Sequence, residues 1–419
     1  MGTDGTYLPR LADTTLSWLM SEMPATMVVG PRATGKTTTA RRHVASVVRL
    51  DRPAEAVAFA ADPDAALAAF REPVLLDEWQ SVPDVLGAVK RAVDNDARPG
   101  RFLLTGSVRA EFGTRTWPGT GRVTPLAMYG LTVREQQGNV AGEGFLDVLA
   151  RGEVEALELP DPLPDLTGYV ELALGGGFPE AALRAPGPAR RAWLDGYLDQ
   201  MLTRDAALLG SRSTVRLRRY FEALALSSAG VADHRTLYEA AGIDRRTAVA
   251  YDDLLAGLHV AEELPAWLSN RLSRLVKGGK RYVVDPALIG AALHLDVPAV
   301  LRDGDLLGQL LDTFVAAQLR PEVALSDRRP RLHHLREKSG RHEVDLLVEG
   351  AAGTVVALEV KATAAPTRRD GQHLAWLRDE LGDRFLCGAV LHTGPAVGSL
   401  GDRVFALPIA AIWGPREAV

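Results

Sequence analysis

The sequence has 419 residues, too many for one ordinary hydrophobic core, which predicts two or three domains. A hydrophobic share of 47% and a charged share of 24% are typical of globular proteins and exclude a largely disordered chain. The net charge of −5 excludes a surface that is basic all over, so any contact with nucleic acid must be local. A single cysteine, Cys387, excludes an internal disulfide framework, and no apolar run of 18 residues stands out. We therefore expect a cytoplasmic protein without a membrane segment.

Residues 8–23 predict a helix, and the segment after it carries the most specific motif in the chain. The apolar run 27–29 leads into the pattern G-x-x-x-x-G-K-[ST], and residues 38–48 predict the helix that follows. In such a loop, backbone amides surround the phosphates of ATP, a lysine reaches the β- and γ-phosphates and a hydroxyl faces Mg²⁺. The alternative is a glycine-rich turn with a chance lysine. The residues that we expect to hold ATP are Gly30, Pro31, Arg32, Ala33, Thr34, Gly35, Lys36, Thr37 and Thr38, with Thr37 also at the metal.

A second strand, at residues 73–77, ends in two acids. Asp77 is predicted to support Mg²⁺, and Glu78 to polarise the water that attacks the γ-phosphate. The alternative is a pair of helix-capping carboxylates. A third strand, at residues 101–105, ends near the hydroxyl of Ser107, which suits a γ-phosphate sensor at the same sheet edge or, equally, a helix cap.

Further strands are predicted at residues 54–60 and 122–128, which completes a parallel α/β sheet. Arg122 precedes the last strand. In a homo-oligomer it could reach a neighbour's γ-phosphate, and otherwise it is a surface charge.

Residues 140–164 are acidic and contain proline, which predicts a linker. The glycines at 175–177 predict a turn or, alternatively, a contact loop, and a helix is expected at 189–209. Three helices at 216–230, 234–241 and 245–258 then have helix-turn-helix spacing.

Polar segments at 262–268 and 278–285 would form the wing of a winged helix. Residues 212–281 contain 12 Lys and Arg against 8 Asp and Glu, an excess that suits contact with double-stranded DNA. Arg245 and Arg246 open the expected recognition helix. A module that binds protein partners is the alternative.

The C-terminal part predicts a helix at 306–319 that carries Asp312, and strands at 331–335, 343–348 and 355–360. The last two strands form a hairpin that brings Asp345, Glu359 and Lys361 together. Lysine is rare here, since only six of the 48 basic residues are Lys, and this favours a chemical role for Lys36 and Lys361. The alternative is that these charged side chains only keep the hairpin soluble, since hairpin edges often carry pairs of Glu and Lys for that reason alone.

The chain resembles prokaryotic proteins that combine an AAA-type ATPase core with a C-terminal DUF4143 domain. The resemblance rests on the phosphate loop, Leu-Leu-Asp-Glu, Leu-Thr-Gly-Ser, Gly-Gly-Phe-Pro-Glu, Arg204-Asp205, Glu-Val-Asp-Leu-Leu-Val and Leu-Glu-Val-Lys. It implies a C-terminal fold similar to PD-(D/E)xK nucleases, with Asp345, Glu359 and Lys361 at metal-binding and water-activating positions. Asp312 stands where similar proteins usually have Glu, as a further metal ligand.

The sequence therefore predicts an α/β protein with a P-loop ATPase core at 1–138, a linker and helical segment at 139–211, a winged helix at 212–290 and a nuclease-like domain at 300–419. The expected function is hydrolysis of ATP with Mg²⁺, in association with DNA. The alternative function is a signalling or defence ATPase whose C-terminal parts bind proteins without cutting nucleic acid.

Overall fold

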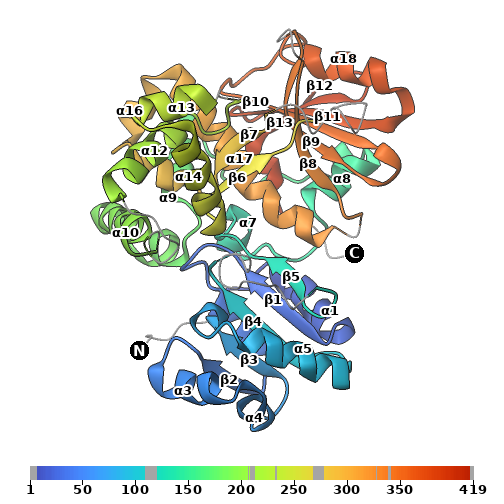
Figure 1. Cartoon of the computed structure of the whole chain (residues 1–419). Helices are drawn as coiled ribbons and strands as arrows, with labels where there is room; N and C mark the ends of the chain where they lie inside the picture. The colour runs from blue at the N-terminus through green and yellow to red at the C-terminus, as the bar shows by residue number, and fades with distance from the viewer. Residues whose placement is uncertain are drawn as a thin grey trace. The chain divides into compact units, whose positions relative to one another are not determined.

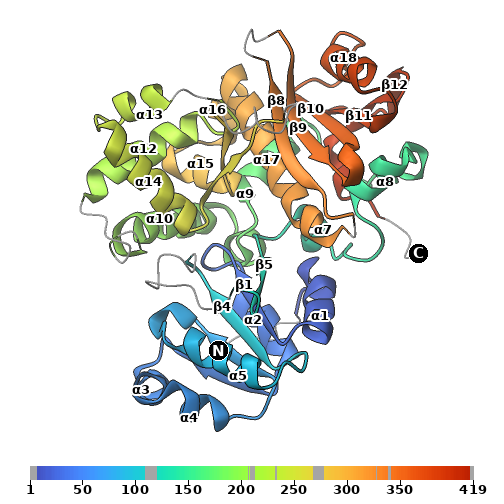
Figure 2. The same cartoon turned by 45° about the vertical axis from the view of Figure 1, so that its right-hand side comes forward.

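The computed structural model describes residues 7–108, 120–205, 207, 213–231, 234–267, 278–326, 328–337 and 341–415. The chain forms two compact units (Figures 1 and 2). One comprises residues 9–130 together with 253–260, and the other contains the remainder of the chain. We describe each unit by itself.

A five-stranded sheet forms the centre of the first unit. Every strand pair in it is parallel. The carboxyl ends of the strands therefore meet at one edge. The three central strands are buried over almost their whole length, as expected for a sheet covered on both faces. The strand order is β2 (Ser46–Arg49), β3 (Val74–Asp77), β4 (Phe102–Gly106), β1 (Ala25–Val29) and β5 (Thr124–Ala127).

Helices cover both faces of this sheet (Figure 2). Leu16 and Leu19 of α1 pack with Ala40 of α2 against one face. Phe59, Leu67 and Val89 pack against the other face. The helices are α1 (Ala12–Glu22), α2 (Lys36–Ala40) with the 3₁₀ turn η1 (Arg41–His43), α3 (Pro53–Ala61), α4 (Pro63–Ala68), η2 (Trp79–Ser81) and α5 (Val85–Asn95).

The parallel sheet is confirmed, but one of its strands was predicted in the wrong place. Residues 54–60, expected as a strand, form helix α3, which begins with Pro53 in its first turn and contains alanine at most positions. The strand β2 instead overlaps the end of the helix expected at 38–48. Ser46–Arg49 contains two adjacent valines, whose branched side chains favour a strand.

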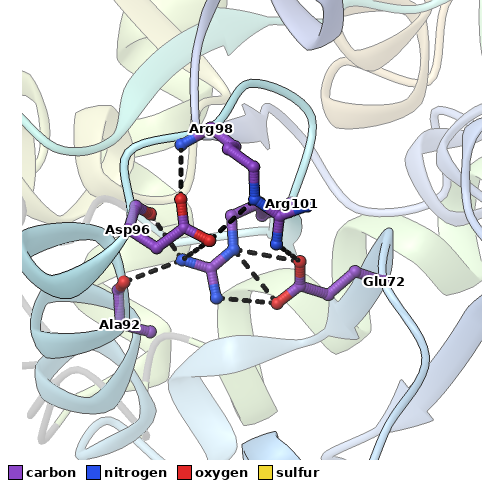
Figure 3. Close-up of polar contacts among 5 residues, drawn as sticks. All are labelled: Glu72, Ala92, Asp96, Arg98 and Arg101. Carbon is purple, nitrogen blue, oxygen red and sulfur yellow. Dashed lines mark hydrogen bonds and ion pairs between the residues drawn. The ribbon is translucent and has the colours of Figure 1, made fainter.

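Arg101 ties three segments of the first unit together (Figure 3). Its guanidinium donates to both carboxylate oxygens of Glu72, with a shortest distance of 2.7 Å, and to the carbonyl of Ala92 at 2.7 Å. It also donates to the carbonyl of Asp96. A cation at the C-terminal end of α5 satisfies carbonyl groups that the helix leaves unpaired, so Arg101 holds α5 against the starts of β3 and β4.

The second unit contains a helical group and a larger sheet. Within the helical group, α15 packs on α9, α10, α12 and α17. The glycines at 175–177 are part of this packing, because the amide of Gly177 donates to the buried carboxylate of Asp285 at 2.9 Å. The elements are α7 (Val133–Gln136), α9 (Leu166–Gly175), the π-helical turns η4 (Glu180–Arg184) and η5 (Met201–Asp205), α10 (Gly187–Gln200), α15 (Pro286–Ala292), α16 (Val297–Leu301) and α17 (Gly304–Leu325).

The three helices and the hairpin expected between residues 212 and 290 are confirmed as individual elements. Asp244 caps the third helix through the amide of Thr247 at 3.0 Å. The two strands of the hairpin are antiparallel, with Leu264 opposite Lys280. That these elements form a winged helix stays a prediction. They are α12 (Thr214–Leu226), α13 (His234–Ala240), α14 (Arg245–Gly257), β6 (Ala261–Leu264) and β7 (Lys280–Val283).

A six-stranded mixed sheet dominates the C-terminal part (Figure 1). Leu374, Leu377 and Leu381 of α18 pack on one face, and α8 packs on β10 and β11. The hairpin of β9 and β10 is confirmed, with Leu346 opposite Leu358. The strand order is β12 (Gly398–Gly401), β13 (Val404–Pro408), β11 (Phe385–His392), β10 (Val355–Lys361), β9 (Glu343–Glu349) and β8 (Arg331–Arg336), and the remaining helices are α18 (Gln372–Leu381), η7 (Ala351–Gly353), η8 (Gly382–Arg384) and η9 (Ile409–Ile412).

Part of the segment expected as a linker is instead folded. Residues 145–151 form α8, whose buried Phe145, Leu146 and Leu149 lie against the C-terminal sheet and α17. A short turn, η3 (Val154–Ala156), follows. Proline and acidic residues suggested a linker here, but the apolar side chains of α8 are spaced for one buried helix face. The domain boundaries expected at 138, 211 and 290 stay predictions.

Candidate functional site

The loop between β1 and α2 has the backbone shape that its glycines predict. Gly30 and Gly35 have φ angles of 153° and 96°. A Cβ atom at Gly30 would lie 2.0 Å from the carbonyl oxygen of Met128, so no larger residue fits there. The loop is thereby open for backbone amides to approach a phosphate chain.

An arginine from before α1 braces this loop. Arg10 is buried, and its guanidinium donates to the carbonyl of Thr34 at 2.8 Å and to that of Tyr129 at 2.9 Å. Thr34 also donates its hydroxyl to the carbonyl of Pro31 at 3.0 Å. Arg10 therefore fixes the loop to the end of β5. Sequence reasoning missed Arg10, since nothing in its local sequence distinguishes it from other arginines.

Lys36 lies folded back onto the loop. Its ammonium donates to the carbonyl of Gly30 at 3.0 Å and to that of Pro31 at 2.6 Å. Burial lowers the pKa of Lys36 to about 8, against the raising effect of Glu78 and Asp77. The ammonium is thus held by weak neutral acceptors, which a phosphate chain can replace. Arg32, Ala33 and Thr38 of the expected loop are exposed.

Two hydroxyl groups meet on the carboxylate that ends β3. Thr37 donates to Asp77 Oδ1 at 2.7 Å, and Thr105 donates to the same oxygen. Arg49, at the end of β2, lies 3.8 Å from Asp77 Oδ2. Hydroxyl and carboxylate oxygens are hard ligands of the kind that Mg²⁺ prefers, so Thr37 and Asp77 fit the expected ion.

Glu78 has a left-handed backbone, with φ 56° and ψ 52°. This conformation is uncommon for a residue other than glycine and often occurs at functional sites. The carboxylate of Glu78 accepts a hydrogen bond from Gln80 and another, of 3.3 Å, from Ser107. Gln80 also donates to Ser107 at 3.2 Å. Glu78 and Ser107 are thus brought together as expected, while Gln80 was not anticipated because its position depends on the turn η2.

Arg122 pairs with a carboxylate of its own unit. It lies 2.8 Å from Asp94, and its side chain is 42% exposed. This is the contact expected of a surface charge, and a role toward a neighbouring chain stays a prediction.

The arginines expected to contact DNA open helix α14 and are exposed. The basic residues of the hairpin that the structure describes are instead buried and lie close to carboxylates. Lys280 is buried, and Arg281 lies 3.2 Å from Asp252 and 3.9 Å from Glu263. Of the residues that the structure describes, therefore, Arg245 and Arg246 are better placed for DNA than those of β7.

The hairpin of β9 and β10 brings the expected C-terminal residues together. Lys361 donates to Glu359 at 2.8 Å, and the amide of Val360 donates to Asp345 at 3.0 Å. Burial and the nearby Asp345 raise the pKa of Glu359 to about 8. The second oxygen of Glu359 is buried and accepts no hydrogen bond from the residues that the structure describes.

A residue that we did not expect lies between Asp312 and Asp345. The ammonium of Lys280 donates to Asp312 and, at 3.0 Å, to Asp345. Tyr282, from the same strand, donates to Asp312 at 2.9 Å. Among the described residues, no group of three or more Asp, Glu, His or Cys side chains could hold a metal ion. The arrangement thus differs from the metal site that we expected for Asp312, Asp345 and Glu359, and that role stays a prediction.

Three parts of the chain match known domain families. Residues 22–137 match an AAA domain, residues 166–299 a domain of unknown function (DUF8612) and residues 307–412 a domain of unknown function (DUF4143). The AAA match agrees with the parallel sheet and the loop described above and supports nucleotide binding. The expected DUF4143 resemblance is confirmed, but nothing in the match indicates a nuclease.

Two relatives are uncharacterised proteins of Mycobacterium bovis and Mycobacterium tuberculosis. Each is 28% identical over 391 residues, which is 92% of this chain and 80% of the relative. A Walker-type ATPase of Pyrococcus abyssi is similar in structure, with a TM-score of 0.42, 13% identity and coverage of 67% of this chain and 94% of that one. A TM-score of this size does not establish a shared fold.

The described residues contain no helix with the length and apolarity needed to cross a lipid bilayer.

Proposed function

We propose that this protein binds ATP with Mg²⁺ in the loop from Gly30 to Thr38 and hydrolyses it. The proposal rests on the observation that four side chains lie near one another at the carboxyl ends of β1 and β3. They are Lys36, Thr37, Asp77 and Glu78. Ligands of parallel sheets bind at this edge. The AAA match of residues 22–137 supports the same assignment.

Each residue has a separate role in the proposal. Lys36 leaves the loop carbonyls and binds the β- and γ-phosphates, while Thr37 and Asp77 hold Mg²⁺, which neutralises phosphate charge when bound. Glu78 orients and deprotonates the attacking water, and Gln80 and Ser107 position its carboxylate. The proposal also assigns to Ser107 a hydrogen bond to the γ-phosphate.

We further propose that α14 contacts double-stranded DNA through Arg245 and Arg246. Both arginines are exposed in the first turn of α14. We assign α14 as the second helix of a helix-turn-helix pair, whose N-terminal residues reach the major groove. Because β7 directs Lys280 and Arg281 to internal carboxylates, the proposal places DNA on α14 and not on the hairpin.

The test is the rate of ATP hydrolysis by the full chain, with and without duplex DNA, at several salt concentrations. We expect hydrolysis that depends on Mg²⁺ and increases with DNA, and Glu78→Gln provides the matched inactive control. A chain that fails to hydrolyse ATP would overturn the first proposal. Hydrolysis without any binding of DNA would overturn the second and favour a signalling or defence role with protein partners.

A nuclease-like role for Asp345, Glu359 and Lys361 stays a prediction. The pair formed by buried Glu359 and partly exposed Lys361 is compatible with it. The contacts of Lys280 with Asp312 and Asp345 argue for a different use of these carboxylates.

A further inference from the structure

The site formed by Asp312 and Asp345 already contains a positive charge. Lys280 comes from β7, about 30 residues before Asp312 in sequence and 65 before Asp345. Its side chain is 2% exposed, and those of Asp312 and Asp345 are 8% and 17% exposed. Burying a charge is costly unless it is paired and hydrogen-bonded, so the three side chains depend on one another.

All four carboxylate oxygens of this pair accept hydrogen bonds. Asp312 accepts one from Tyr282 and one from Lys280. Asp345 accepts one from Lys280 and one from the amide of Val360. The ammonium of Lys280 also lies 3.4 Å from the carbonyl oxygen of Asp345. The cation thus sits among hard oxygen ligands, in the kind of surroundings that a divalent metal ion would take.

The choice of lysine matters, because arginine is the usual cation of this chain. A lysine ammonium is a compact point charge that several oxygens can approach from different directions, whereas a guanidinium is flat and larger. Only six lysines occur in the sequence, and Lys280 is one of them. A small cation is therefore what this buried position requires.

We propose that Lys280 is the resident cation of the Asp312–Asp345 site, so that the site does not take a divalent metal ion unless Lys280 is removed. The proposal concerns the second unit alone and does not depend on ATP hydrolysis. It explains why two carboxylates that the sequence predicted as metal ligands instead pair with a cation of the chain itself. It also gives β7 a function, which is to close this site.

The test is a titration of the nucleotide-free full chain with Mn²⁺, in which free Mn²⁺ is followed by electron paramagnetic resonance. Every variant carries Asp77→Asn, which removes the other candidate metal site. The parent is the chain with Asp77→Asn alone, and we expect it to take up no Mn²⁺ at the Asp312–Asp345 site. Lys280→Met should take up about one ion per chain, since a metal of this type binds through one or two carboxylates. Lys280→Met with Asp345→Asn should lose that uptake.

Thermal melting provides a second readout. Mn²⁺ should raise the melting temperature of Lys280→Met and leave that of the parent unchanged, because a ligand stabilises only the state that binds it. The proposal is overturned if the parent takes up Mn²⁺ and Asp345→Asn abolishes the uptake, or if folded Lys280→Met takes up no more than the parent. Lys280→Gln replaces Lys280→Met if the latter does not fold. If neither folds, the comparison of the parent with Asp345→Asn decides.

Discussion

The hydroxyl of Thr37 donates a hydrogen bond of 2.7 Å to Asp77, although 40 residues separate them in sequence. The contact joins the end of the phosphate loop to the end of β3. It places a hydroxyl and a carboxylate side by side, and both are oxygen ligands of the kind that Mg²⁺ prefers. This relationship makes nucleotide binding the first property to test.

ATP with Mg²⁺ should stabilise the first unit through the phosphate loop. At about one hundred times its dissociation constant, a ligand adds about 2.7 kcal/mol to the free energy of unfolding. For a domain of this size, that corresponds to a rise in Tm of roughly 5–10 °C. Lys36→Ala should abolish the rise, which differential scanning fluorimetry with and without ATP would measure. A Lys36→Ala variant that still shows the full rise would contradict the assignment of this loop.

Glu78→Gln should separate binding from hydrolysis. Glutamine keeps the size of the side chain but cannot take a proton from water, and we expect the hydrolysis rate to fall by about 10²–10⁴-fold. The ATP-dependent rise in Tm should persist, because Glu78 is not assigned to the phosphates. Release of inorganic phosphate under saturating ATP measures the first effect. Hydrolysis at the wild-type rate would show that another group activates the water.

Arg245→Ala with Arg246→Ala should weaken the binding of duplex DNA. The slope of log K against log salt should fall by about 0.9 for each phosphate contact that is lost. Fluorescence anisotropy at several salt concentrations would measure both quantities, with Arg235→Ala, an exposed arginine of the neighbouring helix, as the matched control. An unchanged affinity and slope in the double variant would assign this helix to protein partners.

Arg134→Met should destabilise the second unit strongly. Arg134 and Glu322 are each 2% exposed and lie 3.2 Å apart, and Arg134 also donates to the carbonyl of Asn139 at 2.7 Å. Removing Arg134 takes away a buried ion pair, at a cost of about 3–5 kcal/mol. Denaturation by urea would measure the loss. Arg235→Met, which breaks an exposed pair with Glu239, should cost less than about 0.5 kcal/mol.

Acid should destabilise the second unit through His334. Burial, with Lys280 nearby, lowers the pKa of His334 to about 4, below its ordinary value of 6.5. As the pH falls, the unfolded chain therefore binds a proton first, so the stability present above pH 6.5 is lost between pH 6.5 and 4. From pH 7 to 5, wild type should lose about 2 kcal/mol more than His334→Leu, because each pKa unit corresponds to about 1.4 kcal/mol. Urea titrations of wild type and His334→Leu at both pH values measure the two losses of stability. Equal losses would show that the folded protein does not keep His334 neutral at pH 5.

Local sequence predicted which residues lie together at the carboxyl ends of these strands, because those residues belong to short patterns with a fixed geometry. Gly30 to Thr37 determine a loop, and Asp77 and Ser107 each follow an apolar strand, so their meeting at one sheet edge was predictable. The strand β2 was missed because its two valines were included in the preceding helix. The apolar residues 54–60 suggest a strand, although their alanines and the proline at position 53 favour a helix.

Side chains that act across long distances in sequence could not be predicted in this way. Arg10 and Gln80 have no local signal, because their partners are set by the packing of other elements. Lys280 did have a signal in the sequence, because lysine is rare in this chain. That rarity drew attention to Lys36 and Lys361 and applies to Lys280 equally. We instead counted Lys280 among the basic residues available to DNA, and its burial between two carboxylates corrects that count.

Helix α8 has a practical consequence for work on fragments of this protein. The DUF4143 match begins at residue 307, whereas α8, at residues 145–151, packs on β10 and β11 of the sheet in that region. A fragment that starts near residue 300 would expose the apolar surface that Phe145 and Leu149 cover, and exposed surface of this kind promotes aggregation. Expression of the C-terminal region should therefore begin at residue 131, where the second unit resumes, because the limits of the family match are not the limits of the folded unit.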